Sequence, residues 1–187
     1  MKQKIRFKTY LKFAGVFLLP ICTSAQCELF ESEIGGVKKH MMEVSHLTDS
    51  LATFAESASY TAYLKNARLD AEKVKKLVGK AYTSSEEAVS MASEAQYYAE
   101  VCGVDEIISY AIDAENYATD ARDFADEAFN NAKNAVSAKN LGDIHYYVRK
   151  AHNAIKEAQK AADDAIFAVS IAFTSSKRYS QIDTERD

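Results

Sequence analysis

Residues 104–135 read VDEIISYAIDAENYATDARDFADEAFNNAKNA, and this stretch decides the fold. Small apolar residues recur in it at steps that alternate between three and four residues. A repeat of 3.5 residues is typical of α-helices that pack along one face and supercoil left-handedly. The repeating positions are Val104, Ile107, Ala111, Ala114, Ala118, Ala121, Ala125, Ala128, Ala132 and Ala135.

Two further stretches carry the same spacing, one from Ala71 to Cys102 and one from Ile144 to Ala172. No run of residues alternates apolar and polar side chains as a half-buried strand would. The sequence therefore predicts an all-α protein. We expect an elongated, up-down antiparallel bundle of three to four helices with an alanine-rich coiled-coil seam.

Glycine and aspartate predict where these helices begin and end. Gly103 and Gly142 are placed to end a helix, and Asp105 and Asp143 are placed to cap the next one. Gly36 marks the start of an earlier helix, and the regular spacing is lost near residues 57–60. We expect helices at residues 36–57, 60–102, 105–140 and 143–174.

Alanine alone makes a weak core, because burying one methyl group contributes only about 0.8 kcal/mol. Larger side chains must therefore widen the seam. Tyr110, Tyr117 and Phe124 recur every seven residues, each directly before a seam alanine. Such a stripe favours core packing, and the alternative is an aromatic surface for a ligand.

The first 25 residues have the layout of a secretory signal peptide, with a basic start, a short apolar run and small residues before Gln26. The apolar run is too short to span a bilayer. Cleavage after Ala25 predicts an exported protein that is periplasmic, outer-membrane-associated or secreted. Lipidation at Cys27 or Cys22 and an uncleaved anchor are the alternatives. Residues 26–35 are predicted to be an extended leader, residues 36–174 the bundle, and residues 175–187 a disordered polar tail.

Cleavage would make the protein strongly acidic. All five charges in residues 1–25 are basic, so 18 of 23 Lys and Arg would remain against 27 Asp and Glu, a net charge of about −9 in place of −4. An acidic chain is a poor bulk binder of nucleic acid, which needs basic surface. No transmembrane segment is expected in the mature chain.

Cys27 and Cys102 would be the two cysteines of the exported chain. An even number of cysteines in an exported protein indicates a disulfide. With an extended leader, residues 27–57 would just cover the height of a helix over residues 60–102, which favours pairing of Cys27 with Cys102. Alternatively, Cys102 is a buried seam residue, and Cys27 is free, lipidated or bonded to another chain.

Candidate catalytic and metal-binding residues are few. Glu43 and His46 form one Glu-x-x-His element, whereas a di-metal bundle site needs two, with two further glutamates. His145 and His152 lie seven residues apart without an acidic partner between them on the same face, which disfavours a zinc site. The sequence has no phosphate-binding, dinucleotide-binding or nucleophile-elbow motif. We expect no cofactor, no metal and no catalytic activity.

Charge is distributed unevenly along the predicted rod. Basic residues concentrate near the connection at residues 57–60 and near the connection between the last two helices, and acidic residues concentrate at the other end. These charges are either solvated faces or a binding end. If they bind, Lys73, Lys76, Arg149 and Lys150 are the expected patch for an anionic ligand.

These features predict a non-catalytic structural or interaction protein of the cell envelope or secreted fraction, acting as a helical rod or scaffold. Its expected partner is a second copy of itself or an anionic envelope component. One alternative is a binding module that holds an anionic glycan or lipid headgroup at its basic end. A metal-dependent bundle enzyme is the weakest alternative.

Overall fold

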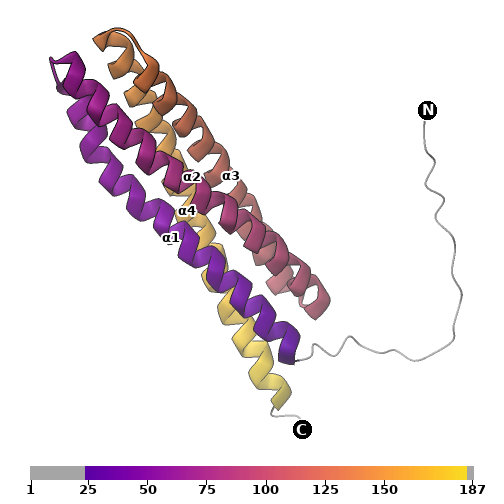
Figure 1. Ribbon diagram of the computed structural model, residues 1–187. Coiled ribbons are helices and arrows are strands. Elements are labelled where there is room, and N and C mark those ends of the chain that lie inside the picture. The colour runs from indigo at the N-terminus through magenta and orange to yellow at the C-terminus, as the bar shows by residue number, and fades with distance from the viewer. Residues whose placement is uncertain (1–23, 185–187) are drawn as a thin grey trace, which may run out of the picture.

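The protein is an elongated bundle of four long helices joined by short connections (Figure 1). The computed structural model describes the backbone of residues 24–184 and the side chains of residues 28–179. The helices are α1 (Ser24–Tyr60), α2 (Leu64–Cys102), α3 (Asp105–Ser137) and α4 (Leu141–Thr184). The all-helical prediction is confirmed, and four helices are present in the described part of the chain.

The four helices form a square in cross-section. Helix α1 packs against α2 and α4, and α3 packs against the same two helices. The pairs α1–α3 and α2–α4 lie on the diagonals and have few contacts. Consecutive helices run in opposite directions (Figure 1), so the α1–α2 and α3–α4 connections share one end of the rod.

Side-chain contacts fix the register between α1 and α2. Ser57 Oγ donates to Asp70 Oδ2 at 2.7 Å, and Ser84 Oγ donates to Glu43 Oε2 at 2.8 Å. A third contact, between His40 Nδ1 and Glu87 Oε2, is 3.1 Å long. Residue numbers add to 127 in every pair, so the two helices keep one antiparallel register over most of their length.

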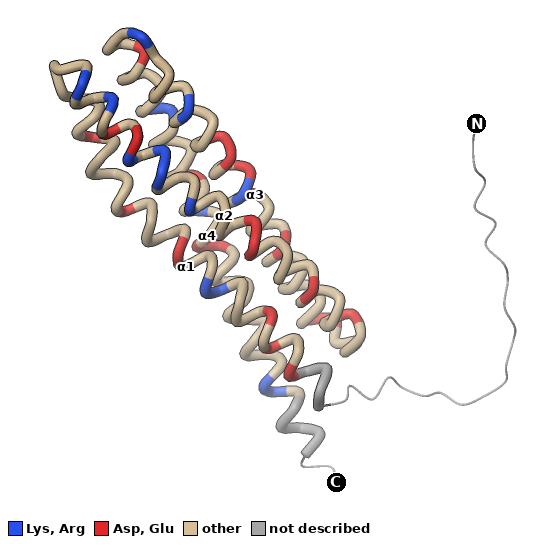
Figure 2. The backbone as a smooth tube through the Cα atoms, viewed as in Figure 1, with Lys and Arg blue, Asp and Glu red and all other residues tan. Residues whose placement is uncertain are grey.

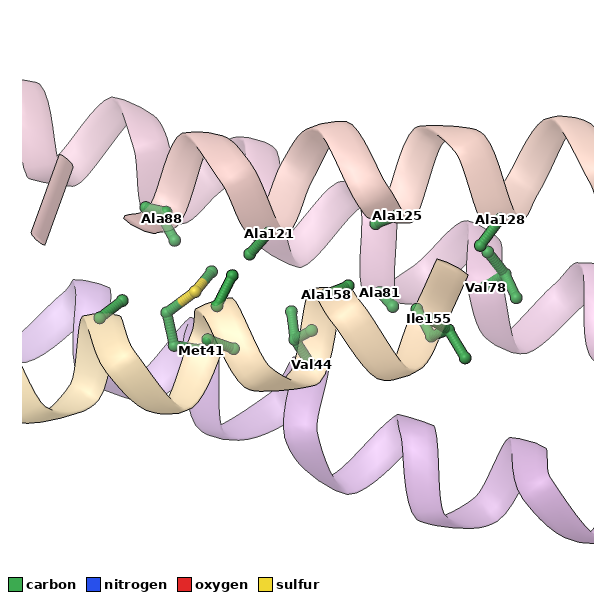
Figure 3. Packing of buried hydrophobic residues seen from close by; sticks show 14 of the residues in the cluster. Met41, Val44, Val78, Ala81, Ala88, Ala121, Ala125, Ala128, Ile155 and Ala158 are labelled. Atoms are coloured by element: carbon green, nitrogen blue, oxygen red, sulfur yellow. The ribbon is translucent and has the colours of Figure 1, made fainter. Parts of the chain in front are cut away.

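The four helices contribute side chains of different sizes to the core. The inner face of α3 consists of Ile107 and eight alanines, all buried. Larger buried side chains come from α1, α2 and α4. Figure 3 shows Met41 and Val44 of α1 and Ile155 of α4 facing alanines of α2 and α3. The bulk that the alanine face of α3 lacks is thus supplied by the other three helices, including α1 on the diagonal.

The predicted extended leader is wrong, because residues 26–35 belong to α1, which begins at Ser24. Phe30 and Ile34 are both buried, and they continue the three–four spacing of Val37 and Met41. Apolar residues at this spacing form one helical stripe, which packs into the core. The helix passes through Gly36, where an added Cβ would collide with the Sδ of Met91. Glycine at this position leaves room for the Met91 side chain of α2.

The predicted disordered tail is also wrong up to Thr184, because α4 continues to that residue. Ser175 and Ser176 are buried, and Ser175 Oγ donates to Glu106 Oε1 at 3.1 Å. Lys177 forms an ion pair with Glu31 of α1. The long α1 and the start of α3 provide partners for this part of α4.

Helix ends differ from the prediction by a few residues. The turn between α1 and α2 lies at residues 61–63, and α3 ends at Ser137. Asp143 does not cap α4, because its backbone N–H donates to Asn140 Oδ1 at 2.9 Å, which makes Asn140 the cap. Asp105 is the first residue of α3 and Val104 is the cap position. Gly103 ends α2 as predicted, with a left-handed φ of 70°.

Candidate functional site

Charge separates along the long axis of the rod. Figure 2 shows basic residues gathered toward the end that carries the α1–α2 and α3–α4 connections, and acidic residues toward the opposite end. We call these the basic half and the acidic half. Basic residues of the first are Lys65, Arg68, Lys73, Lys75, Lys76, Lys80, Lys133, Lys139, Arg149, Lys150, Lys156 and Lys160. Acidic residues of α2 and α3 in the second are Glu86, Glu87, Glu94, Glu100, Asp105, Glu106, Asp113, Glu115, Asp120, Asp123, Asp126 and Glu127.

The four residues of the expected anionic-ligand patch do not form one surface. Lys73 and Lys76 lie on α2, and Arg149 and Lys150 lie on α4, which is the diagonal helix. Lys73 Nζ is 3.0 Å from Asp70 Oδ1 and 4.8 Å from the centre of the Phe54 ring, so it faces α1. The diagonal arrangement separates the two pairs across the bundle.

Arg149 and Lys150, although adjacent, face different helices. Arg149 lines a groove between α1 and α4. Lys150 Nζ lies 5.0 Å from the centre of the Tyr146 ring. The interaction with the Tyr146 side chain raises the pKa of Lys150, and Glu127 of α3 adds to this rise. The two cations therefore act on different surfaces.

The groove between α1 and α4 lies in the basic half. Its volume is about 380 Å³. One wall is α1 with Glu56, Ser59 and Tyr60, and the other is α4 with Arg149, His152 and Asn153. Tyr60 is 81% exposed at the mouth, so its ring is open to a ligand.

Two histidines of α4 bring unpartnered nitrogens to this side of the bundle. The Nε2 atoms of His145 and His152 are buried from solvent without a hydrogen-bond partner in the described structure. Burial lowers the pKa of His152, and the positive charge of Lys156 lowers it further, while Glu56 opposes the shift. A neutral imidazole can donate or accept one hydrogen bond at each nitrogen, so a polar ligand would find a partner here.

The second groove, of about 310 Å³, lies along α1 and α2 and includes Ser57, Asp70 and Lys73. Partial burial acts to raise the pKa of Asp70, but hydrogen bonds from Ser57 and Lys73 outweigh it, so the pKa is lowered. Because these groups already satisfy one another, their arrangement ties α1 to α2.

Residues weighed for metal binding are not brought together. Glu43 accepts a hydrogen bond from Ser84, and the side chains described contain no group of three His, Cys, Asp or Glu that could hold a metal ion. Within the described residues, no helix is both long and apolar enough to cross a membrane. Residues 1–23, which carry most of the predicted signal peptide, lie outside that description.

The predicted disulfide stays a prediction. Cys102 is buried at the end of α2, and the side chain of Cys27 lies outside the described part. The α1–α2 register places residue 27 opposite residue 100. Residue 27 reaches this level because it belongs to α1, and the predicted extended leader is not needed to bring it there.

The sequence does not indicate that Tyr60 and His152 are neighbours. Tyr60 lies where the apolar spacing is lost, and the spacing along the chain relates His152 only to His145. Their proximity depends on α1 closing the square against α4. An exposed tyrosine at a helix end was the available signal, but it does not indicate which helix lies beside it.

Comparisons with protein-family models, with curated proteins and with solved structures find no match to the chain.

Proposed function

We propose that the protein is a non-catalytic, exported rod that acts by surface contacts of its two oppositely charged halves. The observation that carries this proposal is the separation of charge along a bundle of four antiparallel helices (Figure 2). The basic half attracts acidic surfaces, and the acidic half attracts basic ones. The partner is therefore either another copy of the rod or, at the basic half, an anionic component of the envelope.

The inner faces of the helices suit a rod that keeps its shape. Alanines at the three–four spacing are fully buried on α2 and α3. We infer that these faces form a coiled-coil seam, in which small side chains let the backbones approach and keep the helices in register. A rigid bundle would hold the two charged halves a fixed distance apart, as a spacer or scaffold requires.

The proposal is tested by the molar mass of purified protein at low and high salt, with binding to anionic vesicles as a second measurement. Charge contacts are screened over about 8 Å at physiological salt, so both associations should weaken steeply as salt rises. The quadruple variant K73Q/K76Q/R149Q/K150Q should lose most of the association and keep its helicity.

A matched control is K38Q/K39Q/K177Q/R178Q, which removes the same charge from the acidic half. This variant should keep the association that the first variant loses. If neither self-association nor vesicle binding occurs at low salt, or if both survive high salt and the first variant, the charged halves are solvated surfaces and the proposal fails.

A second candidate function is the binding of an anionic glycan or lipid headgroup in the α1–α4 groove. Arg149 supplies a cation, His152 an unpartnered nitrogen and Tyr60 an open ring. A guanidinium can hold a carboxylate or phosphate through two hydrogen bonds, and a tyrosine ring can cover the apolar face of a sugar.

Titration calorimetry with glucuronate and with inorganic phosphate tests this candidate. R149Q should lower the affinity at least tenfold, whereas K150Q, one residue away on another surface, should leave it nearly unchanged. Affinity for glucuronate, which stays ionised where His152 titrates, should rise as pH falls, because protonated His152 adds a positive charge to a groove that already holds Arg149. Equal losses in R149Q and K150Q would show general charge attraction and no site.

A further inference from the structure

The outer face of α2 has a symmetrical pattern of exposed residues. Five residues at intervals of seven point away from the bundle: Leu69, Lys76, Thr83, Ser90 and Tyr97. The outermost two are large apolar side chains, 49% and 62% exposed respectively. They stand 14 residues before and 14 residues after Thr83. Reversing the direction of the helix about Thr83 therefore exchanges Leu69 with Tyr97.

A column of charged residues runs beside this face. Reversing the direction of the helix exchanges the positive residues of this column with its negative ones. Lys73, Lys80, Glu87 and Glu94 follow one another at intervals of seven, and all four are exposed. Reversal about Thr83 brings Lys73 to within one residue of the level of Glu94, and Lys80 to within one residue of the level of Glu87. The face is therefore complementary to its own reversed copy, in charge and in the position of its apolar ends.

We propose that two copies of this chain pair side by side and antiparallel through the outer faces of α2, with a twofold axis at Thr83. Each Lys73 then meets the partner copy at the level of Glu94, and each Lys80 meets it at the level of Glu87. Leu69 of each copy covers Tyr97 of the other, so the interface has one such contact at each end. Such an interface is closed, since each copy uses the same surface.

The middle of the face suits a close approach. Thr83 and Ser90 have small side chains, and Thr83 Oγ1 donates to the carbonyl of Gly79 in its own helix at 3.1 Å. The longer Lys76 is opposite Ser90 of the reversed copy, where the small serine leaves room for it. Small residues at a contact let two helices pack with a short separation. The large apolar residues, Leu69 and Tyr97, stand at the two ends of the face, where they would seal it.

The charges that would pair across the interface are incompletely neutralised within one copy. Glu94 lies near another carboxylate, Glu33 of α1, whose pKa is raised by desolvation and further by the charge of Glu94. Lys80 has no ion pair with any described residue, while Lys73 contacts Asp70 and Glu87 contacts His40. A lysine brought to Glu94 by a second copy would relieve the repulsion with Glu33.

The corresponding column of α3 lacks this symmetry. It contains Asp113, Asp120 and Glu127 at intervals of seven, followed by Asn134. An antiparallel copy would bring acidic residues to acidic residues, which is destabilising. Charge pattern therefore selects α2 over α3 as the surface for a second copy.

Single-cysteine cross-linking tests the geometry, in a background where Cys22, Cys27 and Cys102 are replaced by alanine. After mild oxidation at low salt, T83C should form a disulfide-linked dimer, because the twofold axis brings the two positions together. S90C alone should not, since its two copies would lie about 21 Å apart along the helices. A mixture of K76C and S90C should cross-link.

Other cross-linking patterns would overturn the antiparallel pair in a recognisable way. A parallel pair would cross-link both T83C and S90C in homodimers, and head-to-tail contact would cross-link neither. This inference rests on the proposed function, but the two fail separately. Salt-dependent association without T83C dimers would overturn the α2 pair and leave the charged rod standing. T83C dimers that form equally well when the oxidation is carried out at high salt would uphold the α2 pair and overturn the charged rod.

Charge exchange gives a second test with the native cysteines in place. K73E/K80E makes the column wholly acidic, and E87K/E94K makes it wholly basic. Each variant alone should be monomeric at concentrations where the unchanged protein dimerises, and an equimolar mixture should form heterodimers. Circular dichroism checks that both remain helical. Homodimers of either variant, or no heterodimer on mixing, would contradict the α2 pair.

Discussion

Single residues in this protein are constrained most strongly at the alanine face of α3. Ala118 and Ala125 are fully buried, with helices α2 and α4 on either side. Each side chain is one methyl group, so the space between the backbones is as small as a side chain allows. In an interior packed in this way, adding even one methylene group forces neighbouring atoms to move.

Leucine at Ala118 or Ala125 should lower the free energy of unfolding by about 1–3 kcal/mol, because three added carbons overpack the space between helices. Thermal melts measure the effect. Asn130 provides the control, as it is exposed on the same helix and hydrogen-bonded only to Asp126. Leucine there should change the melting temperature little. Equal melting temperatures of the three variants would mean that α3 does not pack by this face.

Replacing the charged side chain of Glu33 by a neutral one should stabilise the protein. Desolvation raises the pKa of Glu33, and the nearby Glu94 raises it further, so the folded state favours the protonated carboxyl. At neutral pH the ionised form therefore opposes folding. Below the pKa of the unfolded chain the group is protonated in both states and has no such effect.

The substitution E33Q should accordingly raise the melting temperature at pH 7 and leave it unchanged near pH 3. Melts of the variant and the unchanged protein across this range measure the difference. E28Q removes a similar charge from an exposed position of α1 and serves as the control. A stabilisation that is equally large at pH 3 would point to a cause other than ionisation.

At the scale of helices, the register of α1 against α2 governs the predicted disulfide. Paired residue numbers add to 127 along these helices, which puts residue 27 about 3 Å along the axis from the level of Cys102. We expect Cys27 and Cys102 to be bonded within one chain. The long closed loop would stabilise the fold by about 4 kcal/mol in the chain-entropy model.

Peptide mapping without reductant should recover the two cysteines as one linked peptide, and reduction should lower the melting temperature. Protein for this test is made in an oxidising compartment. Alkylation of both thiols without prior reduction would refute the bond. A linked dimer of two Cys27 residues would instead support pairing between chains.

At the scale of the whole molecule, the predicted signal peptide should be dispensable for the bundle. Phe30 is the first described residue buried in the core, so a chain that begins at Gln26 keeps every buried side chain that the structure describes. We expect the exported protein to begin at Gln26 and to carry no lipid, because a glutamine precedes Cys27 where a lipoprotein signal has a small residue.

Intact-mass analysis of protein from the native host measures the start of the chain, and a diacylglycerol mass on Cys27 would contradict the prediction. A recombinant chain starting at Gln26 should melt within a few degrees of the full chain. A large loss of stability would show that residues before Gln26 take part in the fold.

The sequence by itself determined the helical class, the inner faces of α2, α3 and α4, and the left-handed end of α2 at Gly103. These properties depend on spacing and on local conformation, so they can be derived from one stretch at a time. The same spacing continues through Phe30 and Ile34, but Gly36 is a typical helix boundary, so residues 26–35 are predicted to be an extended leader. In the structure Gly36 lies within α1, because the apolar stripe on both sides of it packs into the core.

Only the tertiary structure decided which helices are neighbours. Four antiparallel helices of similar length can close a square in more than one order, and the repeat within each helix does not distinguish the orders. The observed order separates Lys73 and Lys76 from Arg149 and Lys150 across a diagonal, and it puts Tyr60 beside His152. Contacts between segments far apart in the chain depend on how faces fit together, which spacing along one helix does not specify.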